Sequence, residues 1–264
     1  MSVRAHPPPR LRPPRPTGVL GGTVLVALLV HAVATGAWVS PLELLRNAGR
    51  FAEFFAEAIP GDLSRIGPIL YALLVTFEMA LVGTLGGVVL SVPLGVAAAR
   101  NTTPHPVLYG LARGTVALFR TVPDIVWGII FVITVGLGPP AGVLAITVDV
   151  AGFCGRFFAE SIEEVDQGLL DALRAIGARP GAVVAGAVLP SCLPAFVATS
   201  LFALESSTRS AVVLGVVGAG GIGIELTTAM QLLRFDQALT IILVVFAAVL
   251  GVERLSAAIR GRLL

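Results

Sequence analysis

The chain has 264 residues, of which 56% are hydrophobic and only 13% are charged, and its mean hydropathy is +0.92. A soluble globular domain carries more charge and fewer apolar residues, so this composition excludes an ordinary soluble protein. The formal net charge of +2 is small and gives no reason to expect a nucleic-acid partner. A lipid bilayer is the environment that suits such a chain.

The basic side chains comprise 18 arginines, and the sequence contains no lysine. A Walker A loop needs a lysine to reach the phosphates of ATP, so the chain cannot encode its own P-loop ATPase. Schiff-base chemistry is excluded for the same reason. Cys154 and Cys192 are isolated and the histidines are far apart, so we expect neither a disulfide nor a metal site. The residues predict no cofactor and no enzymatic activity.

Long apolar runs predict an all-α, polytopic membrane protein with about six transmembrane helices, because a helix needs about 20 apolar residues to cross a bilayer. The predicted spans are residues 18–39, 71–99, 116–137, 141–158, 191–217 and 238–252.

The part of the chain before residue 66 is expected to form three segments. Residues 1–17 are rich in proline and arginine and predict a disordered cytoplasmic tail. The apolar run 18–39 is too long for a cleaved signal peptide and predicts a retained anchor helix. Residues 40–65 have an amphipathic helical pattern that favours an external interfacial helix, and a helical hairpin packed on other external parts is the alternative. Residues 66–264 then form the membrane core.

The arginines predict the orientation, because cytoplasmic loops carry the excess of positive residues. With the N-terminus in the cytoplasm, the predicted inner segments hold 13 of the 18 arginines and the outer segments hold five. The five outer arginines are Arg46, Arg50, Arg65, Arg209 and Arg234. This orientation places the polar loop 159–190 in the cytoplasm and the Gly138-Pro139-Pro140 turn outside.

The most informative segment is DALRAIGARPGAVVAGAVLP, residues 171–190. An acid, a small residue, a glycine and a later Leu-Pro recur there at offsets that resemble the cytoplasmic EAA loop of ABC-importer permeases. The sequence departs from that pattern at Asp171, Leu173 and Ala187, where Glu, Ala and Ile are usual. The resemblance implies a short coupling helix that docks into a separate ATPase subunit. The residues that it assigns to coupling are Asp171, Ala172, Leu173, Gly177, Leu189 and Pro190.

A glycine-rich block, VLGVVGAGGIG, covers residues 213–223. Together with STRSA at 207–211 and FRTVPD at 119–124, it resembles the phosphonate branch of the ABC-importer permeases. Three of its glycines also fit the dinucleotide fingerprint G-x-G-x-x-G, but no βαβ pattern surrounds them. We interpret the block as a break in a membrane helix that allows close helix packing or borders a pore. The glycines concerned are Gly218, Gly220, Gly221 and Gly223.

Charged residues in or beside the predicted spans are candidates for a translocation path or gate, because charge is costly inside a bilayer. Arg209 suits an anion, since a guanidinium group binds phosphorus oxyanions well. A structural ion pair with Glu205, four residues earlier on the same helix, is the alternative. Asp124 would repel an anion and is assigned a structural or gating role, and Ser210 completes the candidate set.

The resemblance implies the permease subunit of a bacterial inner-membrane ABC importer for phosphonate or a related oxyanion, such as phosphite or a phosphate ester. It implies a second permease copy, cytoplasmic ABC ATPase subunits and an extracytoplasmic substrate-binding protein as partners. The nearer alternative is a permease of the same architecture for methionine or a quaternary amine. The farther one is an ATP-independent secondary transporter, which the absence of an internal repeat disfavours.

Overall fold

The computed structural model describes residues 16–36 and 41–263, and those residues form only helices and turns. The predicted all-α class is therefore confirmed. The chain divides into two units, Met1–Ala56 and Glu57–Leu264, which are described separately.

The first unit contains α1 (Pro16–Ala34), α2 (Pro41–Arg46) and most of α3 (Ala48–Ala58). Residues 1–15 of the predicted tail lie outside the described residues. The apolar part of α1, Leu20–Ala34, is shorter than the predicted anchor and shorter than the length usually needed to span a bilayer. α3 is amphipathic, as the pattern of segment 40–65 predicts, and its place at a membrane interface stays a prediction.

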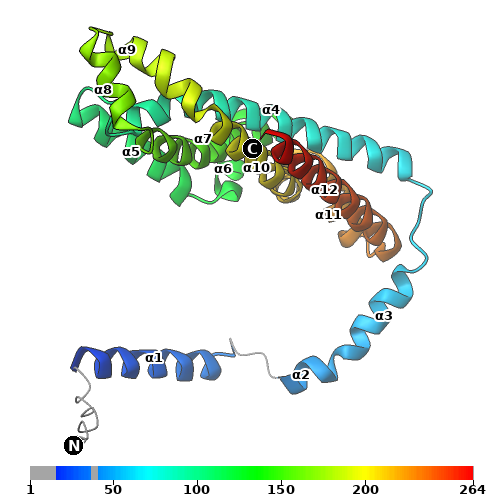
Figure 1. Ribbon diagram of the computed structural model, residues 1–264. Helices are drawn as coiled ribbons and strands as arrows, with labels where there is room; N and C mark the ends of the chain where they lie inside the picture. The colour runs from blue at the N-terminus through cyan, green and yellow to red at the C-terminus, as the bar shows by residue number, and fades with distance from the viewer. Residues whose placement is uncertain (1–15, 37–40, 264) are drawn as a thin grey trace, which may run out of the picture. The chain divides into compact units, whose positions relative to one another are not determined.

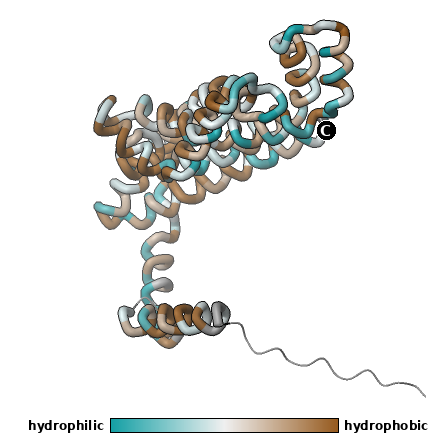
Figure 2. Tube along the Cα trace, turned by 90° about the vertical axis from the view of Figure 1, so that its left-hand side faces the viewer, coloured by the Kyte–Doolittle hydropathy of each residue, from teal (hydrophilic) through white to brown (hydrophobic). Residues whose placement is uncertain are grey.

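The second unit is a bundle of long helices (Figure 1). Its helices are α4 (Ile66–Ala98), α5 (Pro106–Thr121), α6 (Asp124–Val135), α7 (Pro139–Glu163), α8 (Gln167–Ala175), α9 (Pro180–Val183), α10 (Leu189–Leu214), α11 (Ile222–Gln231) and α12 (Phe235–Leu263). Within the described residues, four helices are long and apolar enough to cross a membrane, and a bent pair raises the number to five. Figure 2 shows hydrophobic residues predominating along the long helices of this unit.

The apolar run 116–137 is not one straight span. α5 and α6 meet at an angle of 92° across Val122 and Pro123. Proline disfavours helical backbone at the preceding residue, and Val122 is extended with φ −84° and ψ 121°. The helix before the bend also begins ahead of the predicted span, because α5 starts at Pro106. His105 caps it by accepting a hydrogen bond from the Val107 N–H at 3.2 Å.

The fifth predicted span is longer than the hydropathy indicates. Residues Pro180–Ala219 form one helical stretch of 40 residues, in which π-helical turns at Val184–Val188 and Gly215–Ala219 flank α10. Pro190 has no N–H to donate to the helix. The Leu189 N–H bonds to the carbonyl of Val184, five residues earlier, and not to the carbonyl four residues earlier as in an α-helix, so this turn is wider by one residue. Arg209 lies within α10, inside the predicted span 191–217.

The core of the second unit is the contact between α4 and α7, and small residues on α4 make it close. Gly83, Gly87, Ser91 and Gly95 recur every four residues, so they lie on one face of α4. A Cβ atom on Gly83 would lie 2.7 Å from the Cβ of Ile146, and one on Gly95 would lie 2.8 Å from the Cβ of Phe158. Larger residues at these positions would force the two helices apart.

The turns gather at two opposite ends of the bundle. At one end, the Arg100 N–H bonds to the Glu163 carboxylate at 2.9 Å, which joins the α4–α5 loop to the end of α7. At the other end, the Gly138 N–H bonds to the Gly218 carbonyl at 3.0 Å. The loop 159–190 and the 138–140 turn thus lie at different ends, as the predicted topology requires.

Candidate functional site

α8 projects from one end of the bundle together with α9 (Figure 1). Its start is capped by the Asp166 carboxylate, which accepts a hydrogen bond from the Gly168 N–H at 2.9 Å. Leu170 is fully buried and anchors one side of the helix. The opposite side faces outward and carries Asp171, Ala172 and Ala175. A short helix held by one buried residue is suited to present its other face to a partner.

Gly177 ends α8 in a Schellman motif. Its φ is +84°, a value that L side chains rarely adopt. The Gly177 N–H bonds to the Arg174 carbonyl at 3.0 Å, and the Ala178 N–H bonds to the Leu173 carbonyl at 3.1 Å. The glycine is needed for its backbone angle and not for space, because a Cβ there would meet no atom within 4 Å.

The residues assigned to coupling divide into an exposed and an inward group. Asp171, Ala172, Gly177 and Pro190 are exposed. Leu173 and Leu189 are partly buried and pack against the hydrophobic core, so they support the loop. Ile176, which the sequence pattern did not single out, is 80% exposed beside Gly177. Ile176 follows Ala172 by four residues, so it lies on the same side of the helix end as Ala172.

The α4–α5 loop holds α8 against the bundle. The Arg174 guanidinium forms an ion pair with Asp171 at 3.0 Å and donates to the Asn101 carbonyl at 3.2 Å. The Asn101 side chain donates in turn to the Ile162 carbonyl at 2.6 Å. The neighbouring Arg100 donates to the Tyr109 hydroxyl, and this bond and the charge of Glu163 raise the pKa of Arg100 above its ordinary value. These hydrogen bonds connect α8 to the loop after α4 and to the end of α7.

The glycine-rich block interrupts the helical stretch at the opposite end. Gly218, Gly220 and Gly221 have φ values of +94°, +93° and +74°, and the chain reverses there before α11. A Cβ on Gly215 would lie 2.8 Å from the Cα of Gly223, so the two glycines let the ends of α10 and α11 touch. The Ile222 N–H bonds to the Thr76 hydroxyl at 2.8 Å, which fixes the turn to α4.

The charged candidates do not form one site. Arg209 pairs with Glu253 of α12 at 2.7 Å and with Glu205 at 3.6 Å, and Arg260 pairs with Glu205 at 3.5 Å. Asp124 begins α6, where its carboxylate accepts from the Ile125 N–H at 2.8 Å. Ser210 is partly buried on α10. These ion pairs between α10 and α12 favour the structural role of Arg209 over a role in the anion path.

Comparison with known proteins identifies the fold and the family. Residues 91–263 match the family described as binding-protein-dependent transport system inner membrane component. This chain belongs to that family.

Two relatives and one solved structure illustrate how far the similarity extends. The chain is 37% identical over 94% of its length to the phosphate-import permease protein PhnE of Mycolicibacterium smegmatis, of which it spans 46%. It is 38% identical over 89% of its length to the phosphite transport system permease protein PtxC of Stutzerimonas stutzeri, of which it spans 87%. A chain from a structure of the inward-facing MetNI methionine ABC transporter matches 77% of this chain. The match covers 99% of that chain, with a TM-score of 0.66 and 25% sequence identity.

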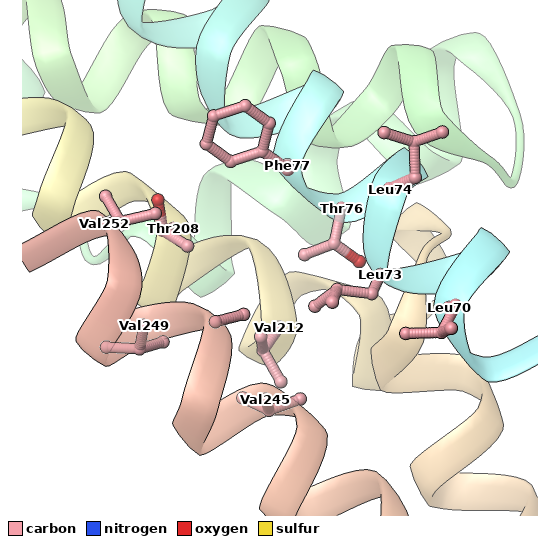
Figure 3. Close-up of a pocket in the computed structure, with 11 residues that line it drawn as sticks. Leu70, Leu73, Leu74, Thr76, Phe77, Thr208, Val212, Val245, Val249 and Val252 are labelled. Carbon is pink, nitrogen blue, oxygen red and sulfur yellow. The ribbon is translucent and has the colours of Figure 1, made fainter. Parts of the chain in front are cut away.

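In this chain, an apolar pocket lies between α4, α10 and α12 (Figure 3). Its volume is about 300 Å³, and Leu73, Phe77 and Val249 are among its lining residues. The hydroxyls of Thr76 and Thr208 are already bonded to the carbonyls of Ala72 and Leu204. The pocket therefore offers no donor that would hold an anion.

A second cavity of about 440 Å³ lies between α5 and α7, and both polar and apolar residues line it. Three arginines line it, namely Arg113, Arg120 and Arg156. From the sequence alone, Arg113 and Arg156 count only toward the orientation of the membrane spans. Arg120 belongs to the FRTVPD segment that resembles the phosphonate branch, and that segment was the signal that could have singled it out.

The ion pairs of Arg209 lead to a testable expectation for the permease. We expect Arg209→Gln to lower the thermal stability of the extracted protein, because Glu253 is left without its closest cation. Arg209→Gln combined with Glu253→Gln should recover part of that loss. Thermal unfolding of the two single variants and the double variant measures the coupling between the residues. Strictly additive losses of stability in the double variant would contradict a structural ion pair and would again favour a role for Arg209 in the anion path.

Proposed function

We propose that this permease imports a phosphorus oxyanion: phosphonate, phosphite or a phosphate ester. The observation that carries the proposal is the extent of similarity to relatives named for phosphate and phosphite. The identity is 37% and 38% over 94% and 89% of this chain, against 25% over 77% for the methionine transporter chain. The segments FRTVPD and VLGVVGAGGIG support the same assignment.

The permease works as part of a larger assembly in this proposal. Two copies form the pore, two cytoplasmic ATPase subunits bind beneath it, and one extracytoplasmic protein delivers the substrate. α8 is the contact with the ATPase, because its outward face with Asp171 and Ala172 ends in the exposed Ile176. Motion of the ATPase reaches the pore through Arg174 and the Asn101 loop, and the pore alternates between outward and inward access.

A transport assay with competing solutes tests the substrate. The permease, its ATPase and its binding protein are expressed together in a host that lacks phosphite uptake. We expect uptake of labelled phosphite, and we expect unlabelled phosphonates to compete while methionine does not. Uptake of methionine without uptake of any phosphorus oxyanion would overturn the proposal. It would favour the second candidate, a methionine permease, which the MetNI likeness supports.

The orientation is part of the proposal and is testable with single cysteines. Cys154 and Cys192 are replaced by alanine, and Ala175→Cys or Pro140→Cys is added to the background without cysteine. Both positions are exposed. A membrane-impermeant thiol reagent on intact spheroplasts should label position 140 and spare position 175, and permeabilised membranes should label both. The reverse pattern would place α8 outside the cell and contradict the topology.

A further inference from the structure

The cavity between α5 and α7 gathers positive charge from two helices. Arg113 and Arg120 come from α5, Arg156 comes from α7, and the remaining lining residues are Val116, Ala117, Thr121 and Glu160. Its volume of about 440 Å³ lies within the range of small-molecule sites, roughly 300 to 1,000 Å³. A small phosphorus oxyanion fits such a space.

Gly152 is the reason that Arg120 reaches this cavity. A Cβ on Gly152 would lie 2.7 Å from the Cβ of Phe119 and 3.1 Å from the Cγ of Arg120. Only a residue without a side chain lets the last turn of α5 lie this close to α7. The bend at Pro123 then directs α6 away, so Arg120 stands at the corner of the bent pair.

Two of the three arginines are already held by carboxylates. Arg113 pairs with Glu163 at 2.9 Å and also donates to the Ala98 carbonyl at 2.7 Å. Arg156 pairs with Glu160 at 2.7 Å. Three arginines and two glutamates leave this group with one net positive charge.

Arg120 differs from its two neighbours. Across the part of the chain that the structure describes, no carboxylate lies within 4.0 Å of its guanidinium. Asp149 of α7 acts on it only at longer range, and Asp124 lies near Asp149. An arginine in a membrane helix normally has a close anionic partner, because an uncompensated charge is costly there. The cavity thus contains a guanidinium whose fork of donors is available for an anion.

We propose that this cavity is a binding station for the transported phosphorus oxyanion, with Arg120 as its direct ligand. The inference rests on the proposed function and specifies the substrate path within it. A planar guanidinium donates two parallel hydrogen bonds to a phosphorus oxyanion and stays charged at every physiological pH. Glu160 and Glu163 form ion pairs with the other two arginines. The anion is therefore bound by one free guanidinium, weakly enough to leave the cavity. The acids Asp124 and Asp149 do not line the cavity, and Asp149 interacts with Arg120 only at longer range.

The first test compares transport with ATP hydrolysis in the reconstituted complex. Arg120→Gln should lower phosphite uptake by at least about tenfold, the scale of a lost charge-assisted hydrogen bond. Stimulation of ATP hydrolysis by the loaded binding protein should remain within about twofold of the original, because α8 is unaltered. Arg120→Lys should retain part of the uptake. Arg254→Gln, which removes an exposed arginine of α12 that does not line the cavity, should transport normally.

The outcomes separate this inference from the proposed function. If the original complex transports phosphite and Arg120→Gln transports it equally well, the station is wrong and the function stands. If Arg120→Gln also loses ATPase stimulation or fails to assemble, Arg120 is structural and the inference is overturned. If the original complex transports no phosphorus oxyanion, the function itself fails.

A second test distinguishes substrate from lipid, since a lipid headgroup offers the same phosphate chemistry. Arg120→Cys in the background without other cysteines should be inactive. A thiol reagent that adds an aminoethyl group should restore uptake by returning the positive charge, and one that adds a sulfonate should not. Free phosphite should slow the modification in nanodiscs of neutral lipid. Protection that requires anionic lipid and ignores phosphite would assign the cavity to lipid and overturn the proposal.

Discussion

Gly177→Asp is expected to abolish ATP-driven uptake while the subunit still inserts in the membrane. The reason is the backbone: Gly177 has φ +84°, and a residue with a side chain resists that angle. The carbonyls of Leu173 and Arg174 would lose the two hydrogen bonds that close α8. The substitution also adds a carboxylate beside Ile176, at the surface proposed to bind the ATPase.

Gly181→Asp is the matched control for this prediction. Gly181 lies four residues later in the same loop, is exposed, and has open space around it without a positive φ. An aspartate near the start of α9 is well tolerated, because helix N-termini favour negative charge. Pull-down and ATPase assays should show normal coupling for Gly181→Asp and none for Gly177→Asp. A fully stimulated ATPase in the Gly177→Asp complex would mean that α8 is not the coupling helix.

Gly220→Leu should prevent accumulation of the folded permease, the largest effect that we expect on assembly. Gly220 has φ +93°, and a Cβ there would lie 2.9 Å from the backbone nitrogen of Pro139. Backbone cannot move aside as a flexible side chain can, so the turn would separate from the start of α7. The bond between the Ile222 N–H and Thr76 would be lost with it.

Gly251→Leu gives the comparison for this second prediction. Gly251 lies in α12, and a Cβ there meets nothing within 4 Å. Leucine is a better helix former than glycine by several tenths of a kcal/mol, so Gly251→Leu should be extracted at the normal level or above it. Size-exclusion chromatography of detergent extracts measures both variants. A monodisperse Gly220→Leu complex at the normal yield would show that the glycine turn tolerates a side chain.

Hydropathy and helix signals predict most of the bundle, because a bilayer imposes long apolar helices whatever their packing. The bend between α5 and α6 escaped prediction, since residues 116–137 are continuously apolar and hydropathy does not register backbone direction. Pro123 was the local signal for it. The number of spans, about six, exceeds the four or five found because α1 is short within the described residues.

The sequence predicts only part of the candidate site. Gly177 and the glycine block stand out in the sequence, since positive φ and close approach leave few residue choices. The Arg120 cavity did not stand out, because its walls come from two helices, and their close approach at Gly152 is not visible in the sequence. The sequence leaves Arg209 open between the anion path and an ion pair with Glu205. It does not reveal the closer partner, Glu253, which lies 44 residues away along the chain.

The most direct test of the central claim is the energy source of uptake. The permease is reconstituted with its ATPase in proteoliposomes, with ATP enclosed and the loaded binding protein outside. An ABC importer should accumulate phosphite only when enclosed ATP and external binding protein are both present, and an inactivated ATPase should abolish uptake. Uptake that follows an imposed ion gradient without ATP would identify a secondary transporter and contradict the account.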